Sequence, residues 1–212
     1  VDRDKAEKVA IECISTLINL GADVNIRDNK GRTPLMYIVR RWGIPVFELV
    51  RSAGADIHAC DNDGRSVFMH SAWRHEKKAI EYARHFISLG EDINRRNNKG
   101  ETILYNAIEY DGIELMKVFL DAGAEINVKN NDGITPLMKS VEMQRYQAMM
   151  SLMAAGADLN AVDAMDRKAI DFFIGAYNDK GLGYFAKMLF MEGMVLEPES
   201  LHRMVEFMEK AK

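Results

Sequence analysis

Gly123-Ala-Glu-Ile-Asn-Val-Lys-Asn-Asn-Asp-Gly-Ile-Thr-Pro-Leu137 contains two short boxes, and both recur along the chain in the same register. The first box, Gly-Ala-Glu-Ile-Asn, belongs to a set of five whose successive spacings are 33, 36, 33 and 33 residues. The second box, Gly-x-Thr-Pro-Leu, opens ten residues after the first and has three related copies. The other copies of the first box begin at Gly21, Gly54, Gly90 and Gly156, and those of the second at Gly31, Gly64 and Gly100. Two boxes that repeat together indicate a chain of similar structural units.

Each unit contains the start and stop signals of two short helices. Proline at the first helical position suits the backbone angle of a helix start, and the preceding threonine hydroxyl can cap free amides, as in Thr33-Pro34 and Thr135-Pro136. A second helix follows, with apolar residues at i, i+3 and i+4 spacing. It ends where a glycine permits a left-handed cap, as at Gly54, Gly90, Gly123 and Gly156. Turn formers such as Asp28-Asn-Lys-Gly31 then precede the next unit.

The two boxes and their period resemble the ankyrin repeat, with its Asp-x-x-Gly-x-Thr-Pro-Leu-His signature, two helices and a closing Gly-Ala-Asp-x-Asn. The resemblance covers about nine-tenths of the chain. It implies an all-α ankyrin-repeat solenoid of stacked helix-turn-helix units with β-hairpin loops, in which each unit buries its apolar face against its neighbours. The predicted single domain, 1–212, comprises a partial repeat at 1–27, full repeats at 28–60, 61–96, 97–129 and 130–162, a divergent repeat at 163–197, and a C-terminal capping helix at 198–210.

Two departures from the repeat pattern carry structural expectations. Asp4-x-x-Glu7 is typical of a capping box and predicts an amphipathic first helix that begins there. Repeat 61–96 has three extra residues around 75–80, and we expect them to lengthen its first helix or the turn after it.

The composition excludes several classes of protein. The 28 Lys and Arg residues against 32 Asp and Glu give a formal net charge of -4, without the basic excess of a general nucleic-acid binder. No apolar run reaches the roughly 18 residues of a membrane span. With only Cys13 and Cys60 and no glycosylation sequon, a cytoplasmic protein is favoured. Because residue 1 is Val, a removed N-terminal signal stays open.

No motif in the sequence favours catalysis or a cofactor. Asp61-Asn-Asp-Gly64 resembles the start of a calcium loop, but the twelfth residue is Ala72 where that loop needs a glutamate. Cys13 lies in an apolar helical stretch, where we expect a small buried side chain. Phosphate loops, nucleophile elbows and dinucleotide fingerprints are absent. The histidines His58, His70, His75, His85 and His202 have no zinc-site spacing and are interpreted as structural. The sequence therefore predicts no enzyme activity, no cofactor and no metal.

The resemblance implies a partner-binding surface made of the turn tips and the exposed sides of the first helices. Carried over by position, its residues are Arg32, Arg40, Arg41, Arg65, Trp73, Arg74, Glu101, Glu109, Tyr110, Ile134, Glu142 and Met143. The helix positions change from Arg40 and Arg74 to Glu109 and Glu142, which indicates a groove that is positive at its N-terminal end. The alternative is an ordinary solvated face.

Three functions fit these observations. The first is a monomeric scaffold or adaptor that binds a partner protein through the concave ankyrin groove. The second is the recognition or regulatory domain of a larger enzyme, channel or secreted effector. The third is a module that inhibits one specific enzyme. Because the fold serves many roles, the sequence does not name the partner.

Overall fold

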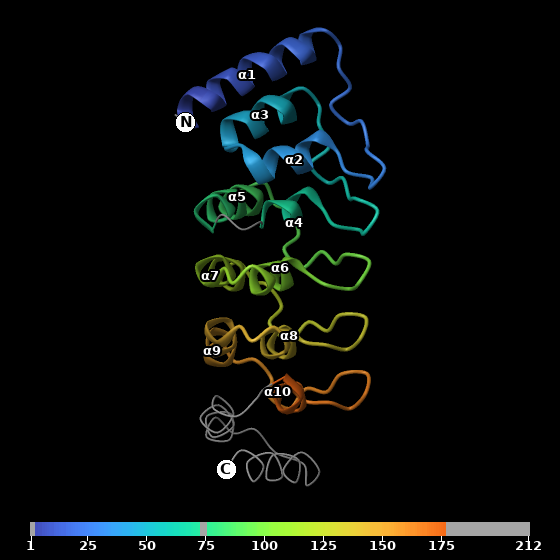
Figure 1. Ribbon diagram of the computed structural model, residues 1–212, viewed down its shortest axis with the longest axis vertical. Coiled ribbons are helices and arrows are strands. Elements are labelled where there is room, and N and C mark those ends of the chain that lie inside the picture. Colours follow the sequence, from blue (N-terminus) through green and yellow to red (C-terminus); the bar gives the residue numbers. More distant parts are fainter. Residues whose placement is uncertain (1–2, 73–75, 177–212) are drawn as a thin grey trace. The chain divides into compact units, whose positions relative to one another are not determined.

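The structure, a computed structural model, describes residues 3–72 and 76–176, and this part of the chain contains ten helices and no β-strand (Figure 1). The predicted all-helical repeat fold is confirmed. The chain divides into two compact units, 1–124 and 125–212. The N-terminal unit contains α1 (Arg3–Asn19), α2 (Pro34–Arg41), α3 (Ile44–Ser52), α4 (Val67–Ser71), α5 (Glu76–Ser88), α6 (Ile103–Glu109) and α7 (Ile113–Asp121). The C-terminal unit contains α8 (Pro136–Glu142), α9 (Tyr146–Ala154) and α10 (Ala169–Ala176).

The helices form pairs, with α2, α4, α6 and α8 as the first helices and α3, α5, α7 and α9 as the second helices. In the N-terminal unit, α2 packs on α4 and α4 on α6, while α5 packs on α7 and α1 covers α3. Figure 1 shows the turns at 28–31, 61–64 and 97–100 on the side of the first helices. In the C-terminal unit, α8 packs on both α9 and α10. No helix among these is long and apolar enough to cross a bilayer.

The local signals explain most helix ends. The Thr135 hydroxyl accepts a hydrogen bond from the amide of Met138 at 3.2 Å, as predicted for a cap, and Ser66 caps α4 in the same way. The prediction is wrong for Thr33, whose hydroxyl is buried and makes no cap hydrogen bond. The predicted left-handed glycine caps are confirmed, because Gly54, Gly90, Gly123 and Gly156 all have positive φ.

Aromatic side chains join the helix pairs of the N-terminal unit. Phe47 on α3 meets Phe86 on α5 edge to face, with ring centroids 5.2 Å apart. Phe86 in turn stacks on Phe68 of α4 at 4.9 Å, and Phe68 contacts Phe119 of α7 at 5.9 Å. All four rings are buried, and such pairs contribute beyond the area that they remove from water. The unit is therefore held together by contacts between successive repeats.

The turns also connect neighbouring repeats through their backbones. The Asn62 amide donates to the Lys30 carbonyl at 2.9 Å, and the Asn98 amide donates to the Asp63 carbonyl at 3.0 Å. Within the described residues the only β-type pairing is one isolated bridge, between Cys60 and Ser66. The predicted β-hairpin loops are therefore not confirmed, and the projecting segments are better described as turns.

In repeat 61–96 the first helix is not lengthened, since α4 has five residues, while the second helix α5 has 13 where α3 and α7 have nine. The turn between α4 and α5, the other place expected for the extra residues, includes 73–75, which lie outside the described residues. Two other expectations differ from the structure. Asp4 lies inside the first turn of α1, which already begins at Arg3. Cys13 is exposed on α1, because the apolar face of that helix is turned elsewhere. The closing helix predicted at 198–210 lies outside the described residues.

One side-chain contact between successive repeats, that of His58 with Glu91, differs from the asparagine hydrogen bonds found at the equivalent positions. Elsewhere in the N-terminal unit an asparagine joins one repeat to the next, as Asn25 does by donating to the Gly54 carbonyl at 3.0 Å and accepting from the Asp56 amide at 2.8 Å. At the equivalent position stands His58, whose Nδ1 lies 2.7 Å from Oε1 of Glu91. Glu91 in turn occupies the place of a buried alanine, and burial raises the pKa of its carboxyl group.

We predict that replacing both members of this pair, His58→Asn with Glu91→Ala, raises the free energy of unfolding at pH 7 by about 1 kcal/mol. The asparagine restores the usual link, and the alanine removes a carboxylate whose ionised form is disfavoured by burial. The buried carboxylate of Glu91 destabilises the fold only when it is ionised, so this destabilisation grows as pH rises through the folded pKa of Glu91. The stability gained by the double variant should therefore be smaller in acid than at pH 7. Urea unfolding at pH 7 and pH 4 measures both effects. His58→Asn alone should destabilise, and a stabilised single variant would contradict this explanation.

Candidate functional site

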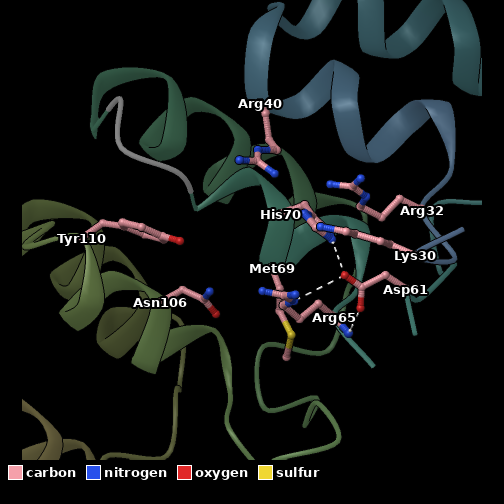
Figure 2. Close-up of a pocket in the computed structure, with 9 residues that line it drawn as sticks. All are labelled: Lys30, Arg32, Arg40, Asp61, Arg65, Met69, His70, Asn106 and Tyr110. Atoms are coloured by element: carbon pink, nitrogen blue, oxygen red, sulfur yellow. Dashed lines mark hydrogen bonds and ion pairs between the residues drawn. The ribbon is translucent and has the colours of Figure 1, made fainter. Parts of the chain in front are cut away.

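The N-terminal unit contains a small hollow of about 90 Å³ that opens to solvent between three successive first helices. Lys30 and Arg32 enter it from the turn before α2, and Arg40 enters from the end of α2 (Figure 2). Asn106 and Tyr110 enter from α6 and its C-terminal cap, on the opposite side (Figure 2). We name this hollow the basic pocket, and its lining residues are Lys30, Arg32, Arg40, Asp61, Arg65, Met69, His70, Asn106 and Tyr110.

The repeat register explains why these residues meet. His70 and Asn106 both lie four positions after the N-cap residue of their helix, Ser66 for α4 and Thr102 for α6. Because the first helices stack, equal positions in successive repeats lie at successive levels of one face. The basic pocket is therefore built from side chains 80 residues apart in the chain, counted from Lys30 to Tyr110.

A buried aspartate and histidine form the floor of the pocket. Asp61 Oδ1 accepts hydrogen bonds from the amides of Asp63 at 3.0 Å and Arg65 at 2.9 Å. Asp61 Oδ2 lies 2.9 Å from His70 Nε2 and 3.3 Å from Arg65 Nε. The side chains of Asp61 and His70 are only 2% and 8% exposed. One carboxylate thus holds its own turn together and ties it to α4.

The protonation states of this pair follow from its surroundings. Burial acts to raise the pKa of Asp61, but the hydrogen bonds from the Arg65 amide and the His70 ring outweigh it and keep the pKa below its ordinary value. For His70, burial lowers the pKa, and the attraction of Asp61 offsets this only in part. At neutral pH the pair is therefore a carboxylate that accepts a hydrogen bond from the N–H of a neutral imidazole.

Two arginines of the pocket, Arg32 and Arg65, are already partnered by carboxylates. Arg32 donates to Asp28 Oδ2 from Nη2 at 2.8 Å, and its guanidinium lies over the Tyr37 ring at 4.7 Å. Arg65 pairs with Asp61 and with Asp63. By contrast, no hydrogen bond or ion pair to a described residue involves the Lys30 ammonium group or the Asn106 carboxamide.

Four cationic side chains line the pocket: Lys30, Arg32, Arg40 and Arg65. Carboxylates of this chain pair with two of them, Asp28 with Arg32, and Asp61 and Asp63 with Arg65.

Comparison with known proteins agrees with this arrangement of repeats. A family model described as ankyrin repeats (3 copies) matches residues 5–97, 43–130 and 76–163. The chain belongs to the ankyrin-repeat family. Ankyrin repeats are generally modules of protein-protein interaction. The comparison with curated proteins gave no match.

The structure brings together four of the residues that the ankyrin signature implies. Arg32, Arg40, Arg65 and Tyr110 all line the basic pocket. Arg41 does not: it is exposed, and its guanidinium lies 5.5 Å from the Trp42 ring.

The remaining predicted residues of the ankyrin surface lie elsewhere. In the N-terminal unit, Glu101 is half-buried and accepts from Asn97 Nδ2 at 3.1 Å, while Glu109 is exposed on α6. In the C-terminal unit, Glu142 is exposed and pairs with Lys139 at 2.8 Å. Ile134 and Met143 of that unit are half-buried. The predicted residues Trp73 and Arg74 lie outside the described residues.

Reasoning from the sequence missed part of the pocket. The sequence indicates Asp61 only as a turn former or the start of a calcium-like segment and His70 only as a structural histidine, and it does not single out Met69 or Asn106 as site residues. The available signal was the repeat register, which places His70 and Asn106 at the same helical position as the exposed Tyr37. The burial of His70 against Asp61 carries no such signal, because it depends on the packing of α2 on α4.

The site holds no arrangement that favours a metal. No group of three or more His, Cys, Asp or Glu side chains comes together among the described residues. Both oxygens of Asp61, the residue that begins the calcium-like segment, are already used by its own turn, by Arg65 and by His70.

We predict that the N-terminal unit loses stability as pH falls from 7.5 to 5. Because the folded pKa of His70 lies below its unfolded value of about 6.5, the unfolded chain binds the proton first in this window. The stability that this difference contributes is fully present above the unfolded pKa of His70 and is lost as pH falls from there through its folded pKa. Asp61, whose pKa is also lowered, adds a further loss only below about pH 4. Urea unfolding across this range should show a weaker pH dependence for His70→Gln, and an unchanged one would contradict the assignment.

Proposed function

We propose that this ankyrin domain is a scaffold or adaptor that binds a partner protein through the face made by its turns and first helices. The observation that carries the proposal is the basic pocket, which lies on that face and gathers side chains from three successive repeats. A site shared by several repeats favours a ligand that extends along them. The cationic side chains that line the pocket would also speed the encounter with an acidic partner.

We further infer a monomeric, cytoplasmic protein without catalytic activity, nucleic-acid partner or cofactor. The two cysteines are free thiols, as is usual in a reducing compartment. The titratable pair Asp61 and His70 is buried and mutually bonded, which supports a structural role over acid-base catalysis. The net charge of -4 favours a protein partner over nucleic acid.

A second candidate is that the same surface serves as the recognition or regulatory domain of a larger enzyme, channel or secreted effector. The binding chemistry is then unchanged, and only the role of the bound partner differs. The sequence of the full-length gene product distinguishes the two candidates, because only the second requires an enzyme, channel or effector part in the same protein.

Affinity capture from the source cell tests the proposal. We predict that the partner retained by the natural domain binds the double variant Lys30→Glu, Arg40→Glu at least about tenfold more weakly, because two attractive charges of the face become repulsive. The matched control is Lys117→Glu, which reverses an exposed charge on the second helix α7, outside the pocket. Calorimetric titration with the purified partner measures the affinities of the natural domain, the double variant and the control. Equal affinities would show that the partner does not use this face.

A further inference from the structure

We propose that the outward side of α1 binds one amphipathic helix of a partner protein. We name this surface the α1 face, and its residues are Val9, Cys13, Leu17 and Leu20 on the helix, with Ala22 and Ile26 after it. The inference goes beyond the proposed function, because none of these residues lines the basic pocket.

The α1 face is a row of exposed apolar side chains. Val9, Cys13, Leu17 and Leu20 follow one another at helical spacing, so they lie on one side of α1, and all four are exposed. The other side of the helix packs on α3. Figure 1 shows α1 as the outermost helix of the N-terminal unit. A contiguous exposed apolar row of this kind is typical of an interaction surface.

The same positions are buried in the other repeats. Leu17 and Cys13 lie four and eight positions before Gly21, the glycine that follows α1. The residues four positions before the equivalent glycines are Val50, Phe86, Phe119 and Leu152, and those eight positions before them are Val46, Tyr82, Leu115 and Ala148. All of these are at most 2% exposed, whereas Leu17 is 56% exposed. Ala22 and Ile26 are likewise exposed where their counterparts Ala55 and Ala59 are buried.

First helices provide much of the cover at these positions. Phe86 stacks on Phe68 of α4, the first helix of its own repeat, with ring centroids 4.9 Å apart. Phe119 of the next repeat contacts the same ring at 5.9 Å. The second helices α3, α5, α7 and α9 all pack on the first helix of their own repeat. The α1 face therefore presents the positions that elsewhere in this chain receive a helix.

α1 lacks a first helix of its own because it does not turn. In three other repeats the chain has left the helix at Trp42, Asp111 and Gln144, twelve positions before the glycine that follows the second helix. The equivalent residue of α1 is Val9, and the helix runs unbroken through it from Arg3 to Asn19. The residues before Val9 thus extend α1 instead of folding back over it. This favours a helix supplied by another molecule.

The charges beside the α1 face favour an acidic helix. The two helices of a repeat are antiparallel, because a short turn joins them, as 143–145 joins α8 to α9. A helix docked on α1 in this manner has its C-terminal end beside the first turns of α1, where Lys5 and Lys8 are exposed. Both the negative end of the helix dipole and acidic side chains there would be attracted to these lysines. Glu12, also exposed, lies further along α1, so the attraction is confined to that end.

NMR titration of the isotope-labelled chain tests the inference with a synthetic helical peptide. The probe is an acetylated peptide of about 14 residues, made of Leu, Ala and Glu, with leucine at i, i+3, i+4 and i+7 and glutamate toward its C-terminal end. One matched peptide has the same residues in scrambled order, and a second has lysine in place of each glutamate. We expect saturable shifts of the α1 amides with the probe, about fivefold weaker binding of the lysine peptide, and none of the scrambled one.

Two variants locate the binding on the α1 face. Leu17→Glu should weaken binding of the probe at least about tenfold, because a charged group would be buried under the docked helix. The double variant Lys5→Glu, Lys8→Glu should prefer the lysine peptide to the probe. The matched control is Met150→Glu, which changes an exposed apolar side chain of α9 and should leave binding unchanged.

The inference is wrong if the probe gives no saturable shifts in α1, if the scrambled peptide binds equally well, or if Leu17→Glu and Met150→Glu lose the same affinity. Other occupants of the face give different results. If the full-length gene product fails to bind the probe while the chain 1–212 binds it, another segment of the same polypeptide covers α1. If light scattering shows a dimer that Leu17→Glu dissociates, a second copy covers it. Either result would overturn the assignment to a partner protein.

Discussion

Asp61→Ala is expected to lower the free energy of unfolding by about 3 kcal/mol. The substitution removes the acceptor of four hydrogen bonds and leaves His70, itself buried, without its partner. Donors left unsatisfied in a buried site cost more than the bond that they lose. Urea unfolding followed by circular dichroism at pH 7.5 measures the change.

The matched control for this variant is Asp28→Ala, in the preceding repeat. Asp28 accepts from the amides of Lys30 and Arg32 and from the Arg32 side chain, so its pattern of bonds resembles that of Asp61. Because Asp28 is exposed, water can replace the lost bonds, and we expect a clearly smaller loss of stability. Equal losses in the two variants would contradict the role assigned to burial.

Gly64→Ala is expected to cost about 3 kcal/mol or more, the second large effect. Gly64 has φ +75°, which alone disfavours a side chain. An added Cβ would also lie 2.7 Å from the backbone nitrogen of Asn98 and collide with Oδ1 of the same residue. The adjacent turn would have to move, and with it the amide of Asn98 that bonds to Asp63. The midpoint of urea unfolding should fall accordingly.

Gly123→Ala distinguishes the cost of a positive φ from the cost of a collision between the added Cβ and a neighbouring turn. Gly123 has φ +89°, but no heavy atom lies within 4 Å of an added Cβ, so only the backbone cost of about 1 kcal/mol applies. The difference between the two variants then reports the close approach of neighbouring turns. If both lose the same stability, the contact between the turns at 61–64 and 97–100 is not rigid.

Much of the fold could be predicted because its signals are local. Proline at the start of α2 and α8 and glycine after α3 and α7 set helix ends by backbone preference, which needs no knowledge of the rest of the chain. The predictions fail where a hydrogen bond or a helix length depends on packing against other parts of the chain. The hydroxyl of Thr33 has the right chemistry for a cap but makes no such bond, and in repeat 61–96 the longer helix is α5, which packs on α7.

The candidate site could be predicted only in part. The resemblance to ankyrin repeats indicates which positions face outward, and it predicts four of the lining residues, Arg32, Arg40, Arg65 and Tyr110. The sequence does not reveal that Arg32 and Arg65 are held by nearby carboxylates, which lowers the positive charge that these two side chains offer to a ligand. Neither does it show that Asp61 is buried, since the same turn in the preceding repeat leaves Asp28 exposed.

Hydrogen exchange of the domain with and without its captured partner tests the central claim, that the turns and first helices form the binding face. We predict slower exchange on binding at 28–41, 61–71 and 97–110, the segments that supply the basic pocket. Exchange in the second helices α3, α5 and α7 should be unchanged. Protection confined to those second helices, with none at the pocket segments, would contradict the account.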